Sequence, residues 1–143
     1  MNGVGRLFLL SGFMNVVALC VFNKGFAGAP AIAAAVPTVF SVESQCLIMM
    51  WGLAYASVAS KWRSVPYLSL VFFLEKMLYV YFWVRFVSVE SNLAKATNMV
   101  VSSSDILTGS FLLLAGPNDF LFGMVFAYAA YVGFQDTSKP KSG

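Results

Sequence analysis

Two adjacent ionisable residues, Glu75 and Lys76, lie in the middle of an otherwise apolar segment, Pro66 to Val87. At a rise of about 1.5 Å per residue, this segment is long enough to cross the hydrocarbon core of a bilayer. Charged side chains at membrane depth cost about 2.5–3.5 kcal/mol each on insertion scales, so they usually face protein or water. These two residues therefore mark a candidate working site.

Each of the two charges needs a partner from another segment, because adjacent residues on a helix point about 100° apart. Asp119, in the last apolar segment, is the predicted partner of Lys76. The candidate donors to Glu75 are Asn15, Tyr79 and, across a bridging water or ligand, Gln45. Such a midplane network either fixes the register of the helices or forms a polar pocket or relay for a headgroup, a small solute or a proton. In the second case Glu75 is the titrating group and Lys76 the electrostatic anchor.

The composition is that of a membrane protein. Of 143 residues, 59% are hydrophobic and only 10% are charged, whereas soluble domains average about 25% charged residues. The mean hydropathy is +0.79. We expect a single transmembrane domain over residues 1–143, because one small soluble core could not hide so much apolar surface.

The chain has no histidine, which is the commonest ligand for haem, zinc and copper and the commonest general base near neutral pH. We therefore expect neither an enzyme nor a metal site. No basic run with interleaved aromatic residues is present, so nucleic acid is not an expected partner. The net charge of +3 suits membrane topology and anionic lipid headgroups better.

The apolar segments predict an all-α fold, a polytopic bundle of four transmembrane helices. The predicted spans are residues 7–23, 41–60, 66–87 and 105–134, followed by a polar tail at 135–143. The first segment could also be a signal peptide, but we expect it to be retained, because Asn15 lies at its centre and further spans follow. Between the first two spans, Gly25 to Phe40 is interrupted by Pro30 and Pro37 and is expected to form a loop packed at the membrane surface.

The basic residues predict the orientation. One side of the predicted bundle carries Arg6, Lys61, Arg63, Lys139 and Lys141, against Lys24, Arg85 and Lys95 on the other. Because cytoplasmic loops are enriched in lysine and arginine, we expect both termini on the cytoplasmic side or its matrix or stromal equivalent.

The last apolar segment is ambiguous, because it is too long for one upright helix and too short for two spans. Either the residues around Pro117 break it into a short interfacial piece and a span, or one long helix kinks there. Small residues that recur every seventh position favour the long, kinked helix: Ser102, Gly109, Gly116, Gly123 and Ala130. The polar connection from Ser88 to Ser104 is expected to be exposed, with room for a short amphipathic helix.

Other residues are expected to serve packing. Small-residue seams for close helix contact are predicted at Gly52, Ala56 and Ser60, and at Gly123 and Ala127. Cys20 and Cys46 lack the spacing of a metal or redox motif and are expected to be buried as small hydrophobic residues.

Candidate pigment or ligand contacts are Glu43, Gln45 and Trp51. A chlorophyll magnesium accepts oxygen ligands, which these carboxyl and amide groups could supply, as could Asn15 or Glu75. Glu43 also has a structural explanation, because a negative charge in the first turn of a helix capped by Ser41 favours the helix dipole.

Four sequence strings carry a resemblance to a known family. A short first span with a central Asn, WGLAYASVA, FLEKMLYVYFW and GPNDFLFGMVFAY follow one another along the chain. In this succession the chain resembles small four-helix membrane proteins of the DoxX-like kind. The resemblance implies a four-helix membrane bundle and leaves the function open.

The leading functional hypothesis is a non-enzymatic accessory subunit of a larger membrane complex, photosynthetic or respiratory, in contact with the lipid bilayer and with other membrane subunits. The alternative is a small lipid, quinone or solute binder or carrier built around Glu75, Lys76 and Asp119. A bound lipid, a quinone or a pigment such as chlorophyll or a carotenoid is the cofactor class that these hypotheses imply.

Overall fold

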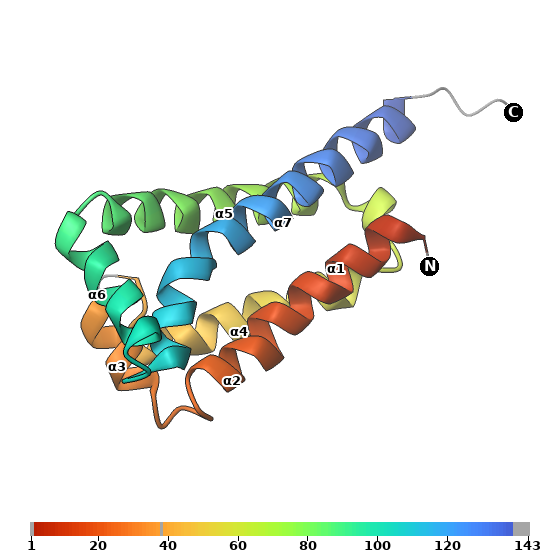
Figure 1. Cartoon of the computed structure of the whole chain (residues 1–143). Coiled ribbons are helices and arrows are strands. Elements are labelled where there is room, and N and C mark those ends of the chain that lie inside the picture. The colour runs from red at the N-terminus through yellow and green to blue at the C-terminus, as the bar shows by residue number, and fades with distance from the viewer. Residues whose placement is uncertain (1, 38, 139–143) are drawn as a thin grey trace, which may run out of the picture.

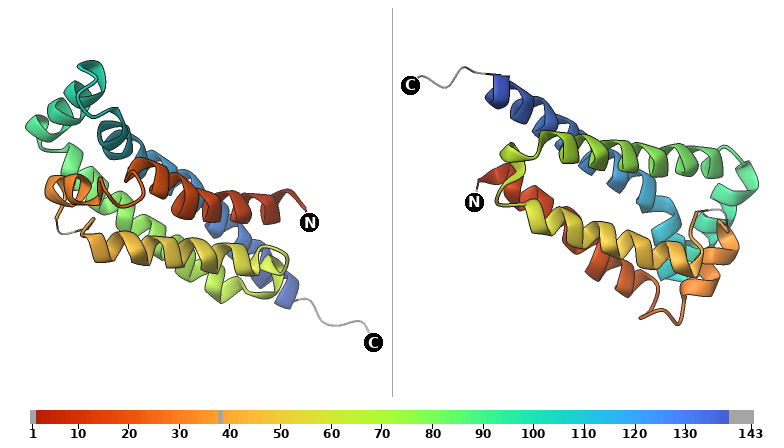
Figure 2. Two further views of the ribbon diagram at one scale, coloured as in Figure 1. Left: turned by 90° about the horizontal axis from the view of Figure 1, so that it is seen from below. Right: turned by 180° about the vertical axis from the view of Figure 1, so that it is seen from behind.

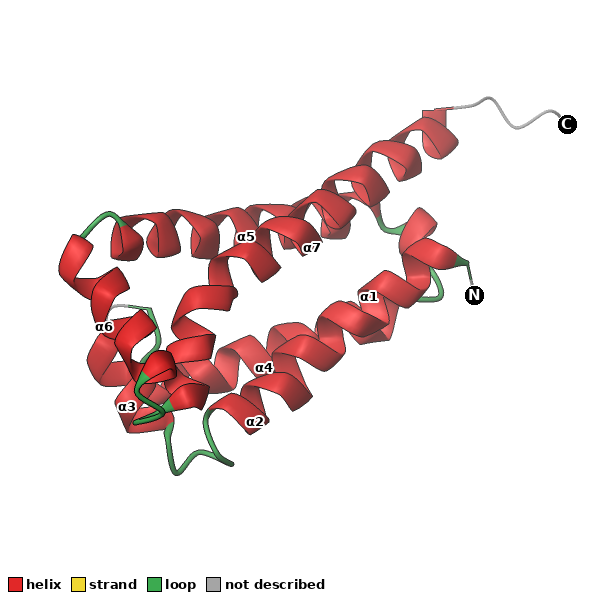
Figure 3. Cartoon of the chain, in the orientation of Figure 1, coloured by secondary structure: helices red, strands yellow, loops and turns green. Residues whose placement is uncertain are grey.

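The chain folds into helices, as the computed structural model shows for residues 2–37 and 39–138, the part of the chain that it describes (Figures 1 and 3). No strand occurs within these residues. A π-helical turn, Met14–Ala18, joins the first two helices, and a 3₁₀ turn, Trp62–Ser64, precedes the fifth. The helices are α1 (Gly3–Phe13), α2 (Leu19–Phe22), α3 (Ala29–Ala35), α4 (Val42–Val58), α5 (Pro66–Val87), α6 (Glu90–Val101) and α7 (Ile106–Ser138).

The long helices pack in two pairs. Helix α5 runs along α7, and α1 with its continuation into α2 runs along α4 (Figures 1 and 2). Helix α1 begins and α7 ends at the same end of the molecule, where the Trp62–Ser64 turn also lies, while α3 and α6 lie at the opposite end (Figures 1 and 2). At the first of these ends the indole of Trp62 donates a hydrogen bond to Asn2, which links the start of the chain to this turn.

Local signals explain several of the helix starts. The side chain of Asn2 accepts a hydrogen bond from the backbone N–H of Gly5, and Ser41 accepts one from Ser44, so both cap the helices that follow. Pro66 is the first residue of α5, where a missing N–H does no harm. The Ser41 cap and the Pro66 start confirm the sequence prediction.

The segment from Gly25 to Phe40 differs from its prediction as a loop, because it contains α3. Pro30 was expected to break a helix, but it lies in the first turn of α3, where proline is tolerated. The predicted amphipathic helix between Ser88 and Ser104 is present as α6.

Helix α7 is continuous through Pro117. The prediction of one long helix is therefore confirmed, and the alternative of a short piece followed by a span is wrong. The helix bends in its first half (Figure 1). It also continues to Ser138, into the segment that was predicted to be a polar tail. Lys139 and Lys141, which contributed to the predicted orientation, lie outside the described residues.

The prediction of four transmembrane helices is wrong. Within the described residues, two helices are long and apolar enough to cross a membrane, Gly3–Phe22 and Ile106–Ser138. Helix α4 has only 17 residues, so it is short for a span. Helix α5 has 22 residues but is not one of the two, and it carries Glu75 and Lys76 at its centre and Arg85 near its end.

Two apolar clusters form the interior, one toward each end of the molecule. The first surrounds buried aromatic rings from four helices: Phe8, Tyr55, Phe72 and Phe126. The second joins helices α2 to α7, and its buried members include Leu19, Ile32, Ile48, Phe86, Ala96 and Phe111. Glu75 and Asn15 lie where the two clusters meet. Glu75 is hydrogen-bonded to Tyr55 of the first cluster, and Asn15 is hydrogen-bonded to Ile48 of the second.

The predicted small-residue seams are used in part. A Cβ atom on Gly52 would lie 2.9 Å from the carbonyl oxygen of Gly12, so α4 and α1 touch backbone to backbone there. Along α7, buried small residues face other elements: Gly109 meets α6, Gly116 meets Trp83, Gly123 meets Met77, and Ala130 is buried. Ala56 also contacts Gly12, and Ala127 is half-buried.

Two seam positions and one cysteine differ from the prediction. Ser60 and Ser102 are exposed, because each lies just beyond the end of a helix, after α4 and α6 respectively. Cys46 is exposed and Cys20 half-buried, so the prediction that both are buried is wrong. Cys46 follows Gln45, whose side chain takes the inward direction on α4.

Candidate functional site: a buried charge network beside an apolar pocket

Lys76 is the centre of the candidate site. Its ammonium group lies 2.6 Å from a carboxylate oxygen of Asp119 on α7, which is the pairing that the sequence predicted. The exposed fractions are 1% for Lys76 and 8% for Asp119, so the ion pair is held away from solvent. A buried pair of this kind is strongly destabilised when one partner is removed, because the other charge stays buried alone.

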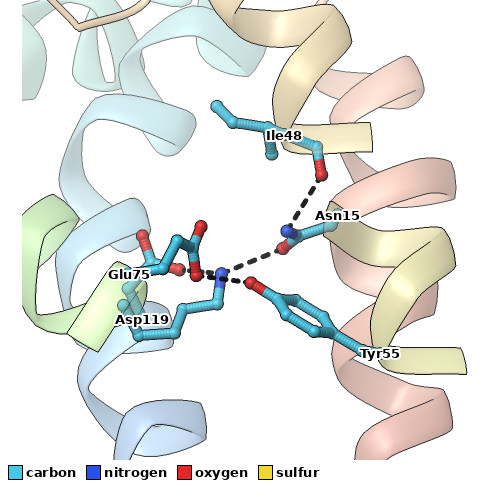
Figure 4. Close-up of polar contacts among 6 residues, drawn as sticks. Asn15, Ile48, Tyr55, Glu75 and Asp119 are labelled. Carbon is cyan, nitrogen blue, oxygen red and sulfur yellow. Dashed lines mark hydrogen bonds and ion pairs between the residues drawn. The ribbon is translucent and has the colours of Figure 1, made fainter. Parts of the chain in front are cut away.

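Asn15 joins this pair to the first helix. Lys76 donates a second hydrogen bond, 3.1 Å long, to the side-chain oxygen of Asn15. The amide nitrogen of Asn15 in turn donates to the backbone carbonyl of Ile48 on α4 at 3.1 Å (Figure 4). These two hydrogen bonds fix the orientation of the Asn15 side-chain amide, because its oxygen faces the Lys76 ammonium group and its nitrogen faces a backbone carbonyl.

The π-helical turn Met14–Ala18 contains Asn15. Such turns insert an extra residue into an α-helix and are frequent at functional sites. The close approach of Gly12 and Gly52 brings α4 against this turn, since a Cβ atom on Gly52 would also lie 2.8 Å from that of Asn15. The π-helical turn and the close packing of α1 against α4 therefore position the Asn15 side chain.

Glu75 is bound by a residue that the sequence analysis did not select. The hydroxyl of Tyr55, on α4, donates a hydrogen bond to Oε2 of Glu75 at 2.5 Å (Figure 4). The predicted donors Asn15, Tyr79 and Gln45 make no hydrogen bond to Glu75 within the described residues. Its second oxygen, Oε1, is buried and has no hydrogen-bond partner there.

A pocket with a cavity volume of about 90 Å³ lies beside the Lys76–Asp119 pair. Buried water needs roughly 10–15 Å³ per molecule on this kind of measure, so the space exceeds a single water site several-fold. The polar residues of its wall are Asn15, Lys76, Tyr79, Asn118 and Asp119. The remaining wall is apolar and includes Ala18, Leu19, Phe22, Ile48, Phe111 and Leu114.

Both irregular helix segments contribute to this wall. Met14, Asn15 and Ala18 come from the π-helical turn, and Leu114 and Asn118 come from α7 on either side of Pro117. Proline removes one backbone hydrogen bond from a helix and favours a bend. The pocket thus lies where two helices depart from regular α geometry.

The predicted pigment or ligand contacts lie outside the wall of this pocket. Glu43 is exposed in the first turn of α4, where hydrogen bonds from the backbone and from Ser41 lower the pKa of its carboxyl. Gln45 is fully buried, and its amide bonds to Asn23 and to the carbonyls of Ala29 and Phe40. These bonds hold the α3 segment against α4. Trp51 packs edge-on against Phe72 in the first apolar cluster.

A second ion pair lies at the end of the molecule where α3 and α6 are found. The ammonium group of Lys24 lies 3.0 Å from Asp105. Partial burial opposes ionisation of Asp105, but hydrogen bonds from Thr108 and Lys24 outweigh it and hold the pKa of its carboxyl below the ordinary value. This pair joins the turn after α2 to the start of α7.

Within the described residues, no three His, Cys, Asp or Glu side chains are grouped closely enough to hold a metal ion. Comparison of the chain with family models, with curated proteins and with solved structures finds no match. The resemblance to DoxX-like proteins therefore stays a prediction, and the functional argument depends on the geometry of the site.

Proposed function

We propose that this chain is a membrane protein that binds an amphiphilic small molecule, a lipid or a quinone, in the pocket beside Lys76. The observation that carries the proposal is the composition of the pocket wall. Five polar side chains, one of them a buried ammonium group, are gathered on a cavity that is otherwise apolar. Binding sites for small molecules have this character, with apolar walls and a few polar groups that orient the ligand.

The outer surface supports a membrane location. In each of the two apolar helices, only 33% of the most hydrophobic window is buried, whereas the core helix of a soluble protein is mostly buried. Large apolar side chains also point outward on α4, α5 and α7: Leu47, Met50, Leu53, Leu74, Leu78, Leu114 and Leu121. Large apolar side chains exposed on several helices suit contact with lipid or with another protein.

The hypothesis of an accessory subunit in a larger membrane complex stays a prediction. The same outward apolar surface would suit partner subunits or lipid tails, and it favours neither. The pocket beside Lys76, in contrast, supports only the binding hypothesis.

The direct test is to purify the protein in a mild detergent and to identify bound small molecules by mass spectrometry. The informative variant is Ala18→Phe, because Ala18 lies in the pocket wall and a phenyl ring there fills the cavity. Its matched control is Val17→Phe, which adds the same ring one position earlier, where the side chain is exposed.

We expect a lipid or a quinone to copurify with the wild type and with Val17→Phe, and to be lost from folded Ala18→Phe. Equal amounts of the same molecule in all three proteins would mean that it binds elsewhere. Stoichiometric partner proteins without any retained small molecule would favour the accessory-subunit hypothesis instead.

A further inference from the structure

The pocket wall also indicates the chemical class of the headgroup. We propose that the pocket selects an uncharged headgroup with an oxygen acceptor, such as the carbonyl of a ketone or a quinone, and that Lys76 donates a hydrogen bond to it. This inference rests on the proposed function, because it specifies what the same pocket binds.

The ammonium group of Lys76 has hydrogen-bonding capacity that its protein partners do not use. A lysine ammonium group has three N–H donors. Two of them are used, one by Asp119 and one by Asn15. The centroid of the Tyr55 ring lies 5.3 Å from the nitrogen, a cation–π contact that supplies no conventional hydrogen-bond acceptor. Among the described residues no third acceptor is present, so one donor stays available beside the cavity that Lys76 lines.

The charges of the pocket wall disfavour an anionic headgroup. The pocket is lined by one cation, Lys76, and by one carboxyl group, Asp119, which already form an ion pair. A second carboxyl group, Glu75, lies next to Lys76 in the chain but outside the wall. An anionic headgroup would therefore meet an ammonium group that is already paired with the Asp119 carboxyl group, with a second carboxyl group on the neighbouring residue.

A cationic headgroup is disfavoured for a different reason. It would compete with Lys76 for Asp119 and would lie close to the ammonium group that it displaces. The unpartnered oxygen of Glu75 could not compensate, because that atom is buried away from the cavity. Any charged headgroup would also lose its hydration on entry, which is costly without a matched partner.

The wall combines polar groups with apolar side chains. Tyr79 and Asn118 lie in the wall with Lys76, while Leu19, Phe22 and Phe111 belong to its apolar part. A neutral carbonyl can accept from Lys76 while the rest of the molecule contacts these apolar side chains. The geometry therefore favours a carbonyl-bearing amphiphile over a fatty acid or an alkylamine.

The experiment compares four probes with the same chain length: 2-dodecanone, dodecanoate, dodecylamine and dodecane. Binding is measured by titration calorimetry in detergent at neutral pH, with competition between pairs of probes. We expect 2-dodecanone to bind about tenfold or more tightly than either charged probe, because each charged headgroup loses its hydration without a matched partner in the wall.

The matched variant is the double substitution Lys76→Met with Asp119→Leu. It removes both charges of the ion pair, so that neither stays buried without its partner. It is preferred over Lys76→Met alone, which leaves Asp119 buried and can fail to fold. We expect the wild type to bind 2-dodecanone about tenfold or more tightly than dodecane, and the double variant to bind it at most about twofold more tightly. The control Lys61→Met removes an exposed lysine and is expected to keep the wild-type preference.

The outcomes separate the two proposals. Tighter binding of dodecanoate or dodecylamine that Ala18→Phe abolishes would overturn the headgroup inference and leave the pocket as a binding site. Retention of the wild-type preference for 2-dodecanone over dodecane in the double variant would overturn the role of Lys76. No binding of any probe, with the same result in the wild type and in Ala18→Phe, would overturn the proposed function itself.

Discussion

The ion pair between Lys76 and Asp119 dominates the energetics at the scale of single residues. Transfer of both charges from water to the interior is unfavourable, and their attraction at 2.6 Å offsets it only because both partners are present. Asn15 adds a hydrogen bond to the same ammonium group. The pair therefore constrains the relative positions of the first helix, α5 and α7, whatever its net contribution to stability.

The first prediction concerns the loss of one partner. Lys76→Met is expected to lower the free energy of unfolding by about 3–5 kcal/mol, because Asp119 then stays buried without a counter-charge. Additional replacement of Asp119 by Leu is expected to recover most of that loss. Unfolding in a series of denaturing detergent mixtures measures both values. A double variant that is no more stable than Lys76→Met would contradict the argument.

The second prediction concerns Tyr55, whose hydroxyl makes the hydrogen bond to Glu75. Tyr55→Phe keeps the ring among Phe8, Phe72 and Phe126 but leaves the Glu75 carboxyl without that donor. We expect a loss of about 1–3 kcal/mol in the free energy of unfolding, the usual effect of an unsatisfied buried polar group.

The control for this prediction is Tyr128→Phe, which removes a hydroxyl from an exposed tyrosine of α7. Its effect on the same unfolding measurement is expected to lie within about 0.5 kcal/mol. Equal stability of Tyr55→Phe and the wild type would mean that Glu75 finds another donor or water in the variant.

The contacts of the site could be predicted from sequence only in part. Lys76 and Asp119 are opposite charges in apolar segments, and few alternatives were open to either of them. Tyr55 was not selected, because tyrosine is common in membrane segments as an interfacial anchor and nothing adjacent to it in the sequence marks it as a donor. The small residues around it, Gly52 and Ala56, were the available signal that a large polar side chain is directed inward there.

At the scale of helices, glycines set the distances between neighbours. A Cβ atom on Gly116 would overlap the indole ring of Trp83, whose nitrogen donates to the backbone carbonyl of Leu112. The ring is thus held on α7 near Pro117 and has little freedom to move away. Helices α5 and α7 can approach this closely only because residue 116 has no side chain.

The third prediction is that Gly116→Ala destabilises the protein. Alanine favours an α-helix over glycine by about 0.8–1 kcal/mol, but overpacking against a fixed ring costs about 1–3 kcal/mol. We expect a net loss of up to about 2 kcal/mol in unfolding measurements. Gly3→Ala, where a Cβ atom meets nothing within 4 Å, is the control and is expected to be neutral or stabilising. A stabilised Gly116→Ala variant would show that Trp83 can shift.

The fourth prediction concerns the link between the turn after α2 and the start of α7. The pKa of Asp105 is lowered in the folded protein, so its contribution to stability is present above the unfolded pKa of about 3.9 and is lost as the pH falls through the folded value. Because Lys24 is largely exposed, the contribution is expected to be at most about 1 kcal/mol.

The test is thermal unfolding of wild type and Asp105→Asn in detergent between pH 2 and pH 7. The difference in midpoint temperature is expected to be small, to favour the wild type at neutral pH, and to shrink toward the acidic end. A difference that grows on acidification would reverse the sign and exclude this ion pair as its origin.

Helix positions were predicted correctly where the sequence carried a single, unambiguous signal for a helix start or for helix continuity. Ser41 and Pro66 mark helix starts, and the periodic small residues of α7 favoured one continuous helix. The segment around Pro30 was predicted wrongly, because proline breaks a helix in its interior and is tolerated in its first turn. From sequence alone, the distinction depended on where α3 begins, and the glycines before it gave no clear boundary.

At the scale of the whole molecule, hydropathy overestimated the number of spans. The average hydropathy of the chain is high, but the charges of Glu75, Lys76 and Arg85 fall in one helix, and α4 is short. Two helices remain as candidates, and both keep most of their apolar surface on the outside. This arrangement suits a protein whose polar groups face inward and whose apolar side chains face lipid.

The last prediction tests that arrangement by adding a charge to the outer face of α7. Leu121 is 66% exposed on this helix, and an arginine at the centre of a spanning helix costs about 2.5–3.5 kcal/mol on insertion scales. If the face contacts lipid, Leu121→Arg is expected to reduce the share of protein that stays in the membrane after an alkaline carbonate wash. Gln135→Arg, an exposed position near the end of α7, is expected to leave that share unchanged. Recovery of the wild type in the wash supernatant would place α7 in water, and the exposed leucines would then need a protein partner to cover them.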